Sequence, residues 1–186
     1  LDPPLVIKPV NEGSSIDVTI CHDNHAVDDA LSKVQDQSGD YMCEAYIKGR
    51  EITVGIANGR VLPFIEIIPA TKTYDYEAKY NRTDTNYVIN PDLTPEVETQ
   101  CRLCAIDVFD RLGCRDIARV DFMVDDQGAW FLEINTMPGF TDHSLVPKAA
   151  ATAGITMSEL CVELVEAACS RSHRQSSHDC TGTSVE

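Results

Sequence analysis

The stretch Ala118-Arg119-Val120-Asp121-Phe122-Met123-Val124-Asp125 is followed, after the turn Asp126-Gln127-Gly128, by Ala129-Trp130-Phe131-Leu132-Glu133-Ile134-Asn135. Its alternating apolar and polar residues predict two strands, and a three-residue loop with Gly128 in the left-handed conformation is a common connection between strands. This loop sets a register in which Asp121 lies opposite Glu133 and Arg119 lies opposite Asn135. The other face of the hairpin then collects the apolar residues Val120, Phe122, Val124, Trp130, Leu132 and Ile134.

The opposed carboxylates of Asp121 and Glu133 require an explanation, because like charges directly across a strand pair are destabilising. One explanation is that Arg119 offsets their charge on a solvated face. The other is a hard cation. Two carboxylates and the amide oxygen of Asn135 are oxygen ligands that suit Mg²⁺ holding the phosphates of a nucleotide.

Hydrophobic periodicity and turn signals around this hairpin predict an α+β fold. Strands are expected at 5–7, 41–47, 51–57 and 61–68, and Asn58-Gly59 predicts a hairpin between the last two. Helices are expected at 24–36, from Thr94-Pro95-Glu96 to Gly113, at 145–153, and from a capping box of Thr156 and Glu159 to about Ser170. The long polar stretch 69–93 is interpreted as a lid, and 171–186 as a disordered tail.

The composition excludes several functional classes. A net charge of −15, from 15 Lys and Arg against 30 Asp and Glu, argues against nucleic acid as a partner. No apolar run approaches the roughly 20 residues that span a bilayer, so we expect no membrane partner and a cytoplasmic location. The eight cysteines are expected to be free thiols; a metal or redox role for Cys101-Arg102-Leu103-Cys104 is the weaker alternative. The chain enters a strand almost at once without an initiator Met, which suggests a start inside a longer protein.

Several motifs in series resemble the D-alanine:D-alanine ligase family of ATP-grasp enzymes. The resemblance runs from residue 5 to about 168. It rests on Ile7-Lys8-Pro9, Glu12-Gly13-Ser14-Ser15, Glu44, Arg50-Glu51-Ile52-Thr53-Val54, Tyr74-Asp75-Tyr76-Glu77-Ala78-Lys79-Tyr80, Arg119-Val120-Asp121, and Leu132-Glu133-Ile134-Asn135-Thr136-Met137-Pro138-Gly139-Phe140-Thr141 with His143-Ser144-Leu145.

The resemblance implies a metal and catalytic centre in the second half of the chain. Asp121, Glu133 and Asn135 resemble the ligands of one or two Mg²⁺ (or Mn²⁺) ions on the β- and γ-phosphates of ATP. Arg119 and the backbone N–H of Gly139 match groups that stabilise negative charge on the transferred phosphate and on the tetrahedral intermediate. Ser144, with Leu145 after it, matches the site of the second D-alanine's carboxylate.

The resemblance also implies contacts to the nucleotide. Lys8 and the hydroxyl and N–H groups of Ser14 and Ser15 resemble phosphate contacts. The residues implied to hold the adenine and the ribose are Glu44, Ala45, Tyr46 and Ile47, in the linker between two nucleotide-clasping subdomains, and Glu51. Lys79 and Tyr80 lie on the loop that closes over the site in this family. Asp17 departs from the family, which has glycine there, and this puts the geometry and charge of the phosphate loop in question.

The implied architecture is an ATP-grasp fold. Residues 1–47 would form part of the central subdomain with its phosphate loop, and 48–170 the C-terminal subdomain with its lid and metal site. The implied reaction joins two D-alanine molecules through an acyl phosphate, with ATP and D-alanine as small-molecule partners, for peptidoglycan precursors; a homodimeric parent stays open. The alternatives are a D-alanine:D-lactate or D-alanine:D-serine ligase, or an ATP-binding remnant without ligase activity. The region that binds the first D-alanine is expected upstream of Leu1.

Overall fold

A computed structural model of the chain describes residues 1–11, 16–35, 37–69 and 85–178, with side chains described up to Arg171. The chain divides into two compact units, unit 1 (Leu1–Lys48) and unit 2 (Gly49–Glu186). This division lies one residue from the boundary proposed between 47 and 48. Each unit combines helices with an antiparallel sheet, which agrees with the predicted α+β class.

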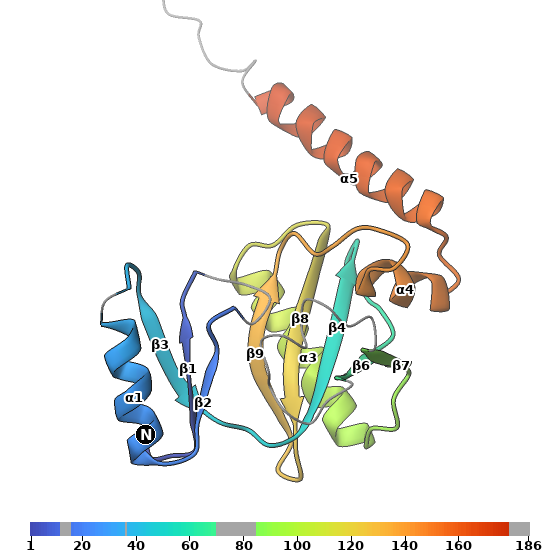
Figure 1. Cartoon of the computed structure of the whole chain (residues 1–186). Helices are drawn as coiled ribbons and strands as arrows, with labels where there is room; N and C mark the ends of the chain where they lie inside the picture. The colour runs from blue at the N-terminus through green and yellow to red at the C-terminus, as the bar shows by residue number, and fades with distance from the viewer. Residues whose placement is uncertain (12–15, 36, 70–84, 179–186) are drawn as a thin grey trace, which may run out of the picture. The chain divides into compact units, whose positions relative to one another are not determined.

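Unit 1 is a three-stranded antiparallel sheet with one helix packed on it (Figure 1). The strands are β1 (Leu5–Pro9), β2 (Thr19–Cys21) and β3 (Tyr41–Ala45), in the order β2-β1-β3. Helix α1 (Asn24–Val34) begins where the Asp23 side chain accepts a hydrogen bond from the N–H of Ala26 at 2.8 Å. Its apolar side packs on Leu5, Ile7 and Cys21. Alternation therefore places Lys8 and Glu44 on the face that α1 does not cover.

Unit 2 is built on a six-stranded antiparallel sheet. Its strands run in the order β7-β6-β4-β8-β9, with β5 paired to β4. Their bounds are β4 Arg50–Ala57, β5 Arg60–Val61, β6 Ile65–Ile68, β7 Asn86–Ile89, β8 Ile117–Val124 and β9 Ala129–Asn135. The helices are α3 Pro95–Arg111, α4 Leu145–Thr152 and α5 Met157–His178.

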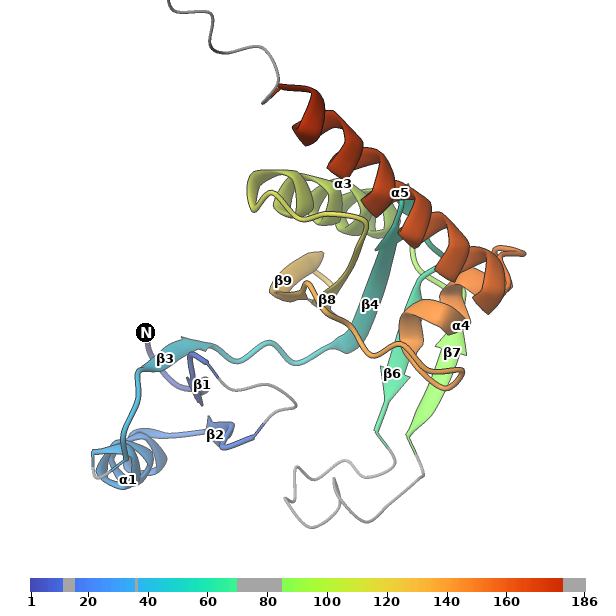
Figure 2. The same ribbon diagram turned by 90° about the horizontal axis from the view of Figure 1, so that it is seen from above.

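Helix α3 covers one face of the β4–β8 pair (Figure 2). Thr94 caps the helix, since its side chain accepts from the N–H of Val97, and Pro95 occupies the first turn, as predicted. Cys101 and Ala105 of α3 pack on alternate residues of the strands, among them Ile52, Val54, Val120 and Phe122. The intervening residues face the other way. They form the polar face of unit 2, which consists of Glu51, Thr53, Arg119, Asp121 and Glu133.

One predicted strand and the predicted lid need correction, whereas the predicted hairpin is present. Asn58 and Gly59 have φ of 48° and 73° and connect β4 to β5 by a two-residue turn, which confirms the predicted hairpin. The expected strand at 61–68 is instead divided into β5 and β6, because Pro63 has no N–H to donate to a neighbouring strand. Strand β7 lies within the stretch interpreted as a lid, of which residues 70–84 are outside the described part.

The β8–β9 hairpin has the predicted register at its functional end but a different turn. Arg119 lies opposite Asn135, and Asp121 lies opposite Glu133, as expected. The connection, however, has four residues, Asp125 to Gly128, and a bulge at Leu132 restores the register. Asp125 organises this turn, because its Oδ1 accepts from the N–H groups of Gln127 and Gly128 and from Trp130 Nε1, all within 3.1 Å.

The same bulge corrects the expected facing of the aromatic residues on β9. Phe131 lies opposite Phe122, and their rings meet edge to face with centroids 6.2 Å apart. Trp130 lies opposite Met123 and is 41% exposed. It therefore does not join the apolar face, where strict alternation had placed it.

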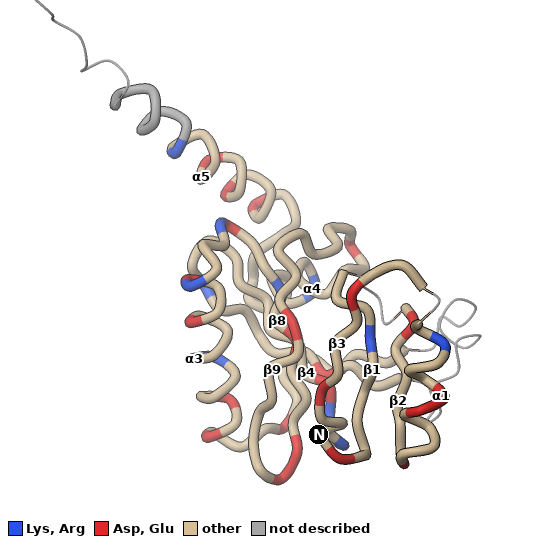
Figure 3. The backbone as a smooth tube through the Cα atoms, turned by 90° about the vertical axis from the view of Figure 1, so that its left-hand side faces the viewer, with Lys and Arg blue, Asp and Glu red and all other residues tan. Residues whose placement is uncertain are grey.

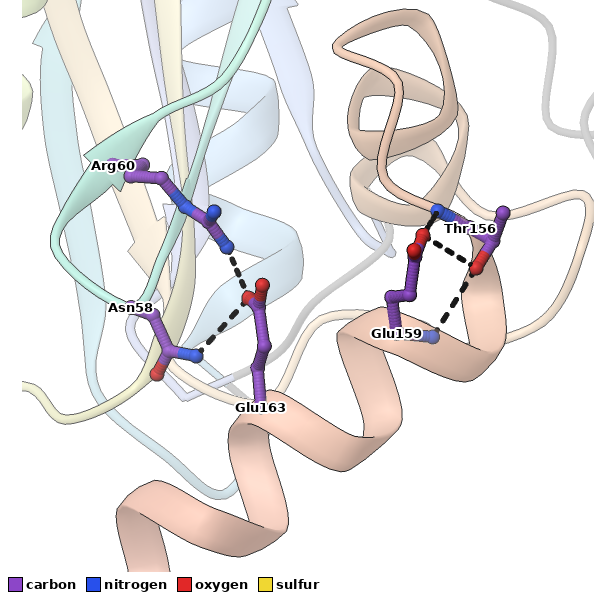
Figure 4. A network of polar contacts seen from close by, with 5 residues as sticks. All are labelled: Asn58, Arg60, Thr156, Glu159 and Glu163. Atoms are coloured by element: carbon purple, nitrogen blue, oxygen red, sulfur yellow. Dashed lines mark hydrogen bonds and ion pairs between the residues drawn. The ribbon is translucent and has the colours of Figure 1, made fainter.

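The end of the chain packs through α4 and α5. Val146 and Ala150 of α4 and Leu160 of α5 form a cluster with Ala57 and Ile65 of the sheet. The predicted capping box is present, since Thr156 N–H donates to Glu159 Oε2 at 2.8 Å and Glu159 N–H donates to Thr156 Oγ1 at 3.2 Å (Figure 4).

Helix α5 is tied to the β4–β5 hairpin and is longer than predicted. Glu163 accepts from Asn58 Nδ2 at 3.3 Å and also pairs with Arg60 (Figure 4). The helix continues past Ser170 to His178, because no Gly or Pro interrupts this stretch. In the described residues, no helix has both the length and the apolar character needed to cross a membrane.

Candidate functional site

Asp121 occupies the centre of the polar face of unit 2. It lies on β8 between Thr53 of β4 and Glu133 of β9, its direct partners in register. Asp121 is 5% exposed and Thr53 is 2% exposed. These two are the buried polar residues of the part that the structure describes. Thr53 Oγ1 donates a hydrogen bond to Asp121 Oδ1 at 2.5 Å. A buried carboxylate is therefore held by a neutral donor from the neighbouring strand.

Arg119 engages both oxygens of the same carboxylate. Its Nη2 lies 2.8 Å from Asp121 Oδ2, and its Nε lies 3.0 Å from Oδ1 and 3.2 Å from Oδ2. Burial opposes the charged form of Arg119, but the hydrogen bond to Asp121 and the charges of Asp121, Glu133 and Glu51 together raise its pKa above the usual value. The guanidinium thus stays charged and lies within the field of three carboxylates.

The described residues of the polar face include two carboxylates directly opposite each other. Glu133 is exposed and lies directly across from Asp121, and Glu51 lies on the same face of β4. The opposed carboxylates of Asp121 and Glu133 therefore lie beside the guanidinium of Arg119, and two like charges so placed favour a cation. No group of three or more His, Cys, Asp or Glu side chains in the described residues converges on one point, so an ion here would also need other oxygen ligands.

Asn135 lies at the end of β9, opposite Arg119. Its Oδ1 accepts a hydrogen bond from the N–H of Met137 at 2.9 Å, which fixes the amide at the start of the following loop. An amide oxygen has two lone pairs, so this bond leaves one for a further partner. The predicted oxygen donors Asp121, Glu133 and Asn135 are thus brought together on two adjacent strands.

The loop after β9 brings Gly139 against Ser144. A Cβ added to Gly139 would lie 3.0 Å from Ser144 Oγ, so only glycine permits this approach without displacement. Ser144 Oγ accepts from the N–H of Thr141 at 3.0 Å and lies 2.9 Å from Thr141 Oγ1. Ser144 is also the N-cap residue of α4, whose first residue is Leu145, and its side chain makes no capping bond to the helix.

Helix α4 closes the polar face at its far end along β4. A Cβ added at Gly55 would lie 3.1 Å from Leu62 Cδ1 and 3.5 Å from Val146 Cγ2. Gly55 follows Thr53 on the same face, so the face is polar at Glu51 and Thr53 and apolar under α4. Packing at that end holds β4 in place beside Asp121.

In unit 1, the predicted phosphate contact Lys8 pairs with the predicted nucleotide contact Glu44. Lys8 Nζ lies 2.8 Å from Glu44 Oε1. After β3 ends at Ala45, the N–H of Tyr46 donates to the carbonyl of Pro4 at 3.2 Å, and the Tyr46 ring meets His22 edge to face. Ile47 follows outside any strand. The remaining predicted site residues are Ser14, Ser15, Lys79 and Tyr80, which lie outside the described residues.

The weaker alternative of a metal or redox role for Cys101 and Cys104 gains no support. Burial, with the charge of Cys104, raises the pKa of Cys101 to about 11, so it is a protonated packing residue of α3. The seven described cysteines are free thiols, as expected. Thr53 is the residue that sequence reasoning missed. It stood in a quoted motif, but only the pairing of β4 with β8 brings it to Asp121.

Comparison with known proteins places the chain in a family. The family described as "D-ala D-ala ligase C-terminus" matches residues 1–166. A D-alanine–D-alanine ligase of Neisseria gonorrhoeae (strain NCCP11945) is 42% identical over 167 residues, which cover 89% of this chain and 55% of the relative. The ligase of Methylacidiphilum infernorum is 40% identical over 166 residues, with the same shares covered. The chain spans about half the length of the curated relatives it matches.

Solved structures give the same result. A Bacillus anthracis D-alanine–D-alanine ligase complexed with ATP has a TM-score of 0.76 and 34% identity, over 94% of this chain and 56% of that one. The Coxiella burnetii ligase has a TM-score of 0.78 and 30% identity, over 94% and 47%. The fold is therefore the ATP-grasp fold of these ligases. By sequence and by structure, the chain belongs to the D-alanine–D-alanine ligase family and corresponds to its C-terminal part.

Proposed function

We propose that the chain is the ATP- and metal-binding part of an ADP-forming D-alanine–D-alanine ligase, which makes the dipeptide for peptidoglycan precursors. The observation that carries this proposal is the polar face of unit 2. There Asp121 and Glu133 lie opposite each other with Asn135 two residues further on β9, and Arg119 pairs with Asp121. This arrangement costs stability without a cation and gains from one. Family membership supplies the reaction.

The donor chemistry of this face fits Mg²⁺ or Mn²⁺. Both are hard cations that take oxygen ligands, and Asp121, Glu133 and Asn135 offer carboxylate and amide oxygens only. The ion, or a pair of ions, would neutralise the charge on the β- and γ-phosphates of ATP. In the structure, Arg119 donates hydrogen bonds to both carboxylate oxygens of Asp121. We therefore infer that the guanidinium moves away from Asp121 when a cation binds, which leaves it available to the transferred phosphate.

The remaining groups have assigned roles in two steps. In the first, a carboxylate oxygen of one D-alanine attacks the γ-phosphorus of ATP, and ADP leaves. In the second, the amine of another D-alanine attacks the acyl carbon, a proton is lost from nitrogen, and phosphate leaves. Arg119 and the N–H of Gly139 are proposed to stabilise the negative charge that develops in these steps. Ser144, beside Gly139 at the start of α4, is proposed to hold the carboxylate of the second D-alanine.

The other nucleotide contacts are proposed from the resemblance and, in unit 1, from the Lys8–Glu44 pair. A lysine paired at 2.8 Å stays ordered until a phosphate competes for it. Glu44 to Ile47 and Glu51 are assigned to the adenine and ribose, and Ser14, Ser15, Lys79 and Tyr80 to the phosphates and their enclosure. We place the reaction in the cytoplasm, which agrees with the free thiols of the seven described cysteines.

Two measurements test the proposal. Calorimetric titration of the chain with ATP should give binding that requires Mg²⁺ or Mn²⁺ and disappears with EDTA. In the full-length protein, phosphate release from ATP should require D-alanine, and replacing half of it by D-lactate or D-serine should give no mixed product. Metal-independent ATP binding would contradict the metal assignment. ATP turnover indifferent to D-alanine would contradict the ligase assignment.

A further inference from the structure

Thr53 and Asp121 form a buried polar pair on central strands of unit 2. They lie directly opposite each other on β4 and β8, and the 2.5 Å bond from Thr53 Oγ1 to Asp121 Oδ1 joins them. Both residues are at most 5% exposed, and in the part of the chain that the structure describes they are the two buried polar residues. A valine of the same shape would pack here without a buried hydroxyl. The hydroxyl therefore calls for a role beyond filling space.

The two donors to Asp121 differ in how they respond to a cation. Arg119 is positively charged, so a metal ion near Asp121 repels it and competes with it for the carboxylate. Thr53 is neutral, and an ionised carboxylate has about four lone-pair sites, so its hydrogen bond and a metal ion can share the carboxylate. Thr53 is thus the donor that can hold Asp121 both before and after a cation arrives.

The position of Thr53 also makes its hydroxyl a rigid guide. A β-branched side chain has few χ1 rotamers, and this one is enclosed between strands. Packing of α4 over Gly55 holds β4 near this point. The hydroxyl can therefore restrict rotation of the Asp121 carboxylate, as outer hydrogen-bond partners do for metal ligands in general.

We propose that Thr53 is a positioning residue for Asp121: its hydroxyl orients the carboxylate for a divalent cation, while Arg119 holds the carboxylate only until the cation binds. This inference rests on the proposed function, which assigns Asp121 to the metal. It adds to that function a residue on another strand that does not itself contact the ion.

The test compares the chain with Thr53→Val, which removes the hydroxyl and keeps the shape, and Thr53→Ser, which keeps the hydroxyl. Binding of Mn²⁺ with ATP is measured by equilibrium dialysis, as the Mn²⁺ retained with the protein in excess of that in the protein-free Mn²⁺–ATP compartment, and stability by urea unfolding. We expect Thr53→Val to weaken Mn²⁺ binding by about 10- to 100-fold and Thr53→Ser to keep most of the affinity. Thr99→Val is the matched control, because the Thr99 hydroxyl bonds only to the Pro95 carbonyl of its own helix.

The outcomes separate this inference from the function on which it rests. If the parent chain binds Mn²⁺ and Thr53→Val binds it equally well, Thr53 does not position Asp121 and only the inference fails. If the parent chain itself binds no Mn²⁺ with ATP, the metal assignment fails and the inference fails with it. A loss of affinity in Thr53→Ser equal to that in Thr53→Val would also overturn the inference. Should Thr53→Val not fold, Thr53→Ala removes the hydroxyl without a methyl against the carboxylate and is held to the same criteria.

Discussion

The Lys8–Glu44 pair of unit 1 and the polar face of unit 2 differ in the balance of their charged side chains. In unit 1, Lys8 and Glu44 form a one-to-one pair at 2.8 Å. In unit 2, Arg119 pairs with Asp121 at the same distance, but Glu133, directly opposite Asp121, adds a negative charge that this pair does not neutralise. Other acidic residues of unit 2 are spread over α3, α5 and the β8–β9 turn (Figure 3). The comparison therefore concerns the charges at the two sites and not the total charge of each unit. A balanced face can release its lysine to an anion, whereas the excess of carboxylates in unit 2 is suited to a cation.

The largest expected effect comes from removing charge on unit 2. Glu133→Gln and Asp121→Asn should each abolish Mg²⁺-dependent ATP binding, with at least a hundredfold loss of affinity, because each removes a proposed ligand and part of the charge excess. Calorimetry with and without EDTA measures this loss. Glu163→Gln, in which the replaced glutamate of α5 pairs with Arg60 of β5, is the control for a lost surface carboxylate. If either variant bound Mg-ATP with the affinity of the parent, the assignment of these residues to the metal would be wrong.

The two substitutions should differ in stability. Glu133 is exposed beside a like charge, so Glu133→Gln should leave the free energy of unfolding unchanged or slightly raised. Asp121 is buried and holds both Arg119 and Thr53, so Asp121→Asn should lower that free energy by about 2 kcal/mol. Urea unfolding followed by the fluorescence of Trp130, the single tryptophan, measures both.

A smaller effect is expected from the lysine of unit 1. Lys8→Met should weaken Mg-ATP binding by about tenfold through loss of one charged phosphate contact. Stability should change by less than about 1 kcal/mol, since partly exposed ion pairs contribute little. Lys33→Met, on the last turn of α1, is the control for lost positive charge. Equal effects of the two substitutions on ATP affinity would mean that Lys8 acts only through net charge.

The polar face of unit 2 was within reach of sequence reasoning to the extent that local pairing made it. The opposition of Asp121 and Glu133 depends on one hairpin, and alternation of side chains was enough to predict it. The Asn58-Gly59 turn and the caps at Thr94 and Thr156 were likewise local, because each is decided by residues at most four apart.

Non-local and irregular features were out of reach. Thr53 meets Asp121 across 68 residues of chain, and no local pattern selects that strand pair or its register. The bulge at Leu132 depends on the four-residue turn that Asp125 stabilises, so strict alternation misplaced Trp130. Strand β2, three residues long, also escaped prediction, because it is too short to show a periodic pattern.

The ion pair of Arg50 and Glu66 serves as a reference for the other two pairs, because no ligand is proposed to bind it. Arg50 donates two hydrogen bonds to Glu66, at 2.8 and 2.7 Å, and this hydrogen bonding, against the opposing effect of burial, lowers the pKa of Glu66. The folded chain then holds the proton less tightly than the unfolded chain. The stability from this pair should be complete above the unfolded glutamate pKa of about 4.3 and lost as the pH falls through the lower folded pKa.

The corresponding experiment compares Glu66→Gln with the parent by urea unfolding from about pH 7 to about pH 3. The variant should be less stable by about 1 kcal/mol at neutral pH, and the difference should vanish in acid; Arg50 is partly exposed, which limits the effect. ATP affinity should not change. Glu166→Gln is the matched control, because Glu166 is an exposed glutamate of α5. A stability difference that persists unchanged into acid would show that Glu66 acts through packing.

The smallest expected effect concerns Asp17, which carries a negative charge in unit 1 near the stretch assigned to phosphates. Asp17 is exposed and has φ of 54°, the left-handed conformation that glycine adopts freely and aspartate tolerates at moderate cost. At about 8 Å from a phosphate charge, its repulsion would be roughly 0.5–2 kcal/mol per charge pair. Asp17→Gly should therefore tighten Mg-ATP binding by a few-fold, and the gain should shrink as salt screens the charge. Asp17→Asn separates the two causes, because it removes the charge and still tolerates the left-handed conformation. Calorimetric titrations at low and high salt should show equal gains for both variants if charge dominates and a gain for glycine alone if backbone geometry dominates. Unchanged binding in both would place the Asp17 carboxylate too far from the nucleotide to affect it.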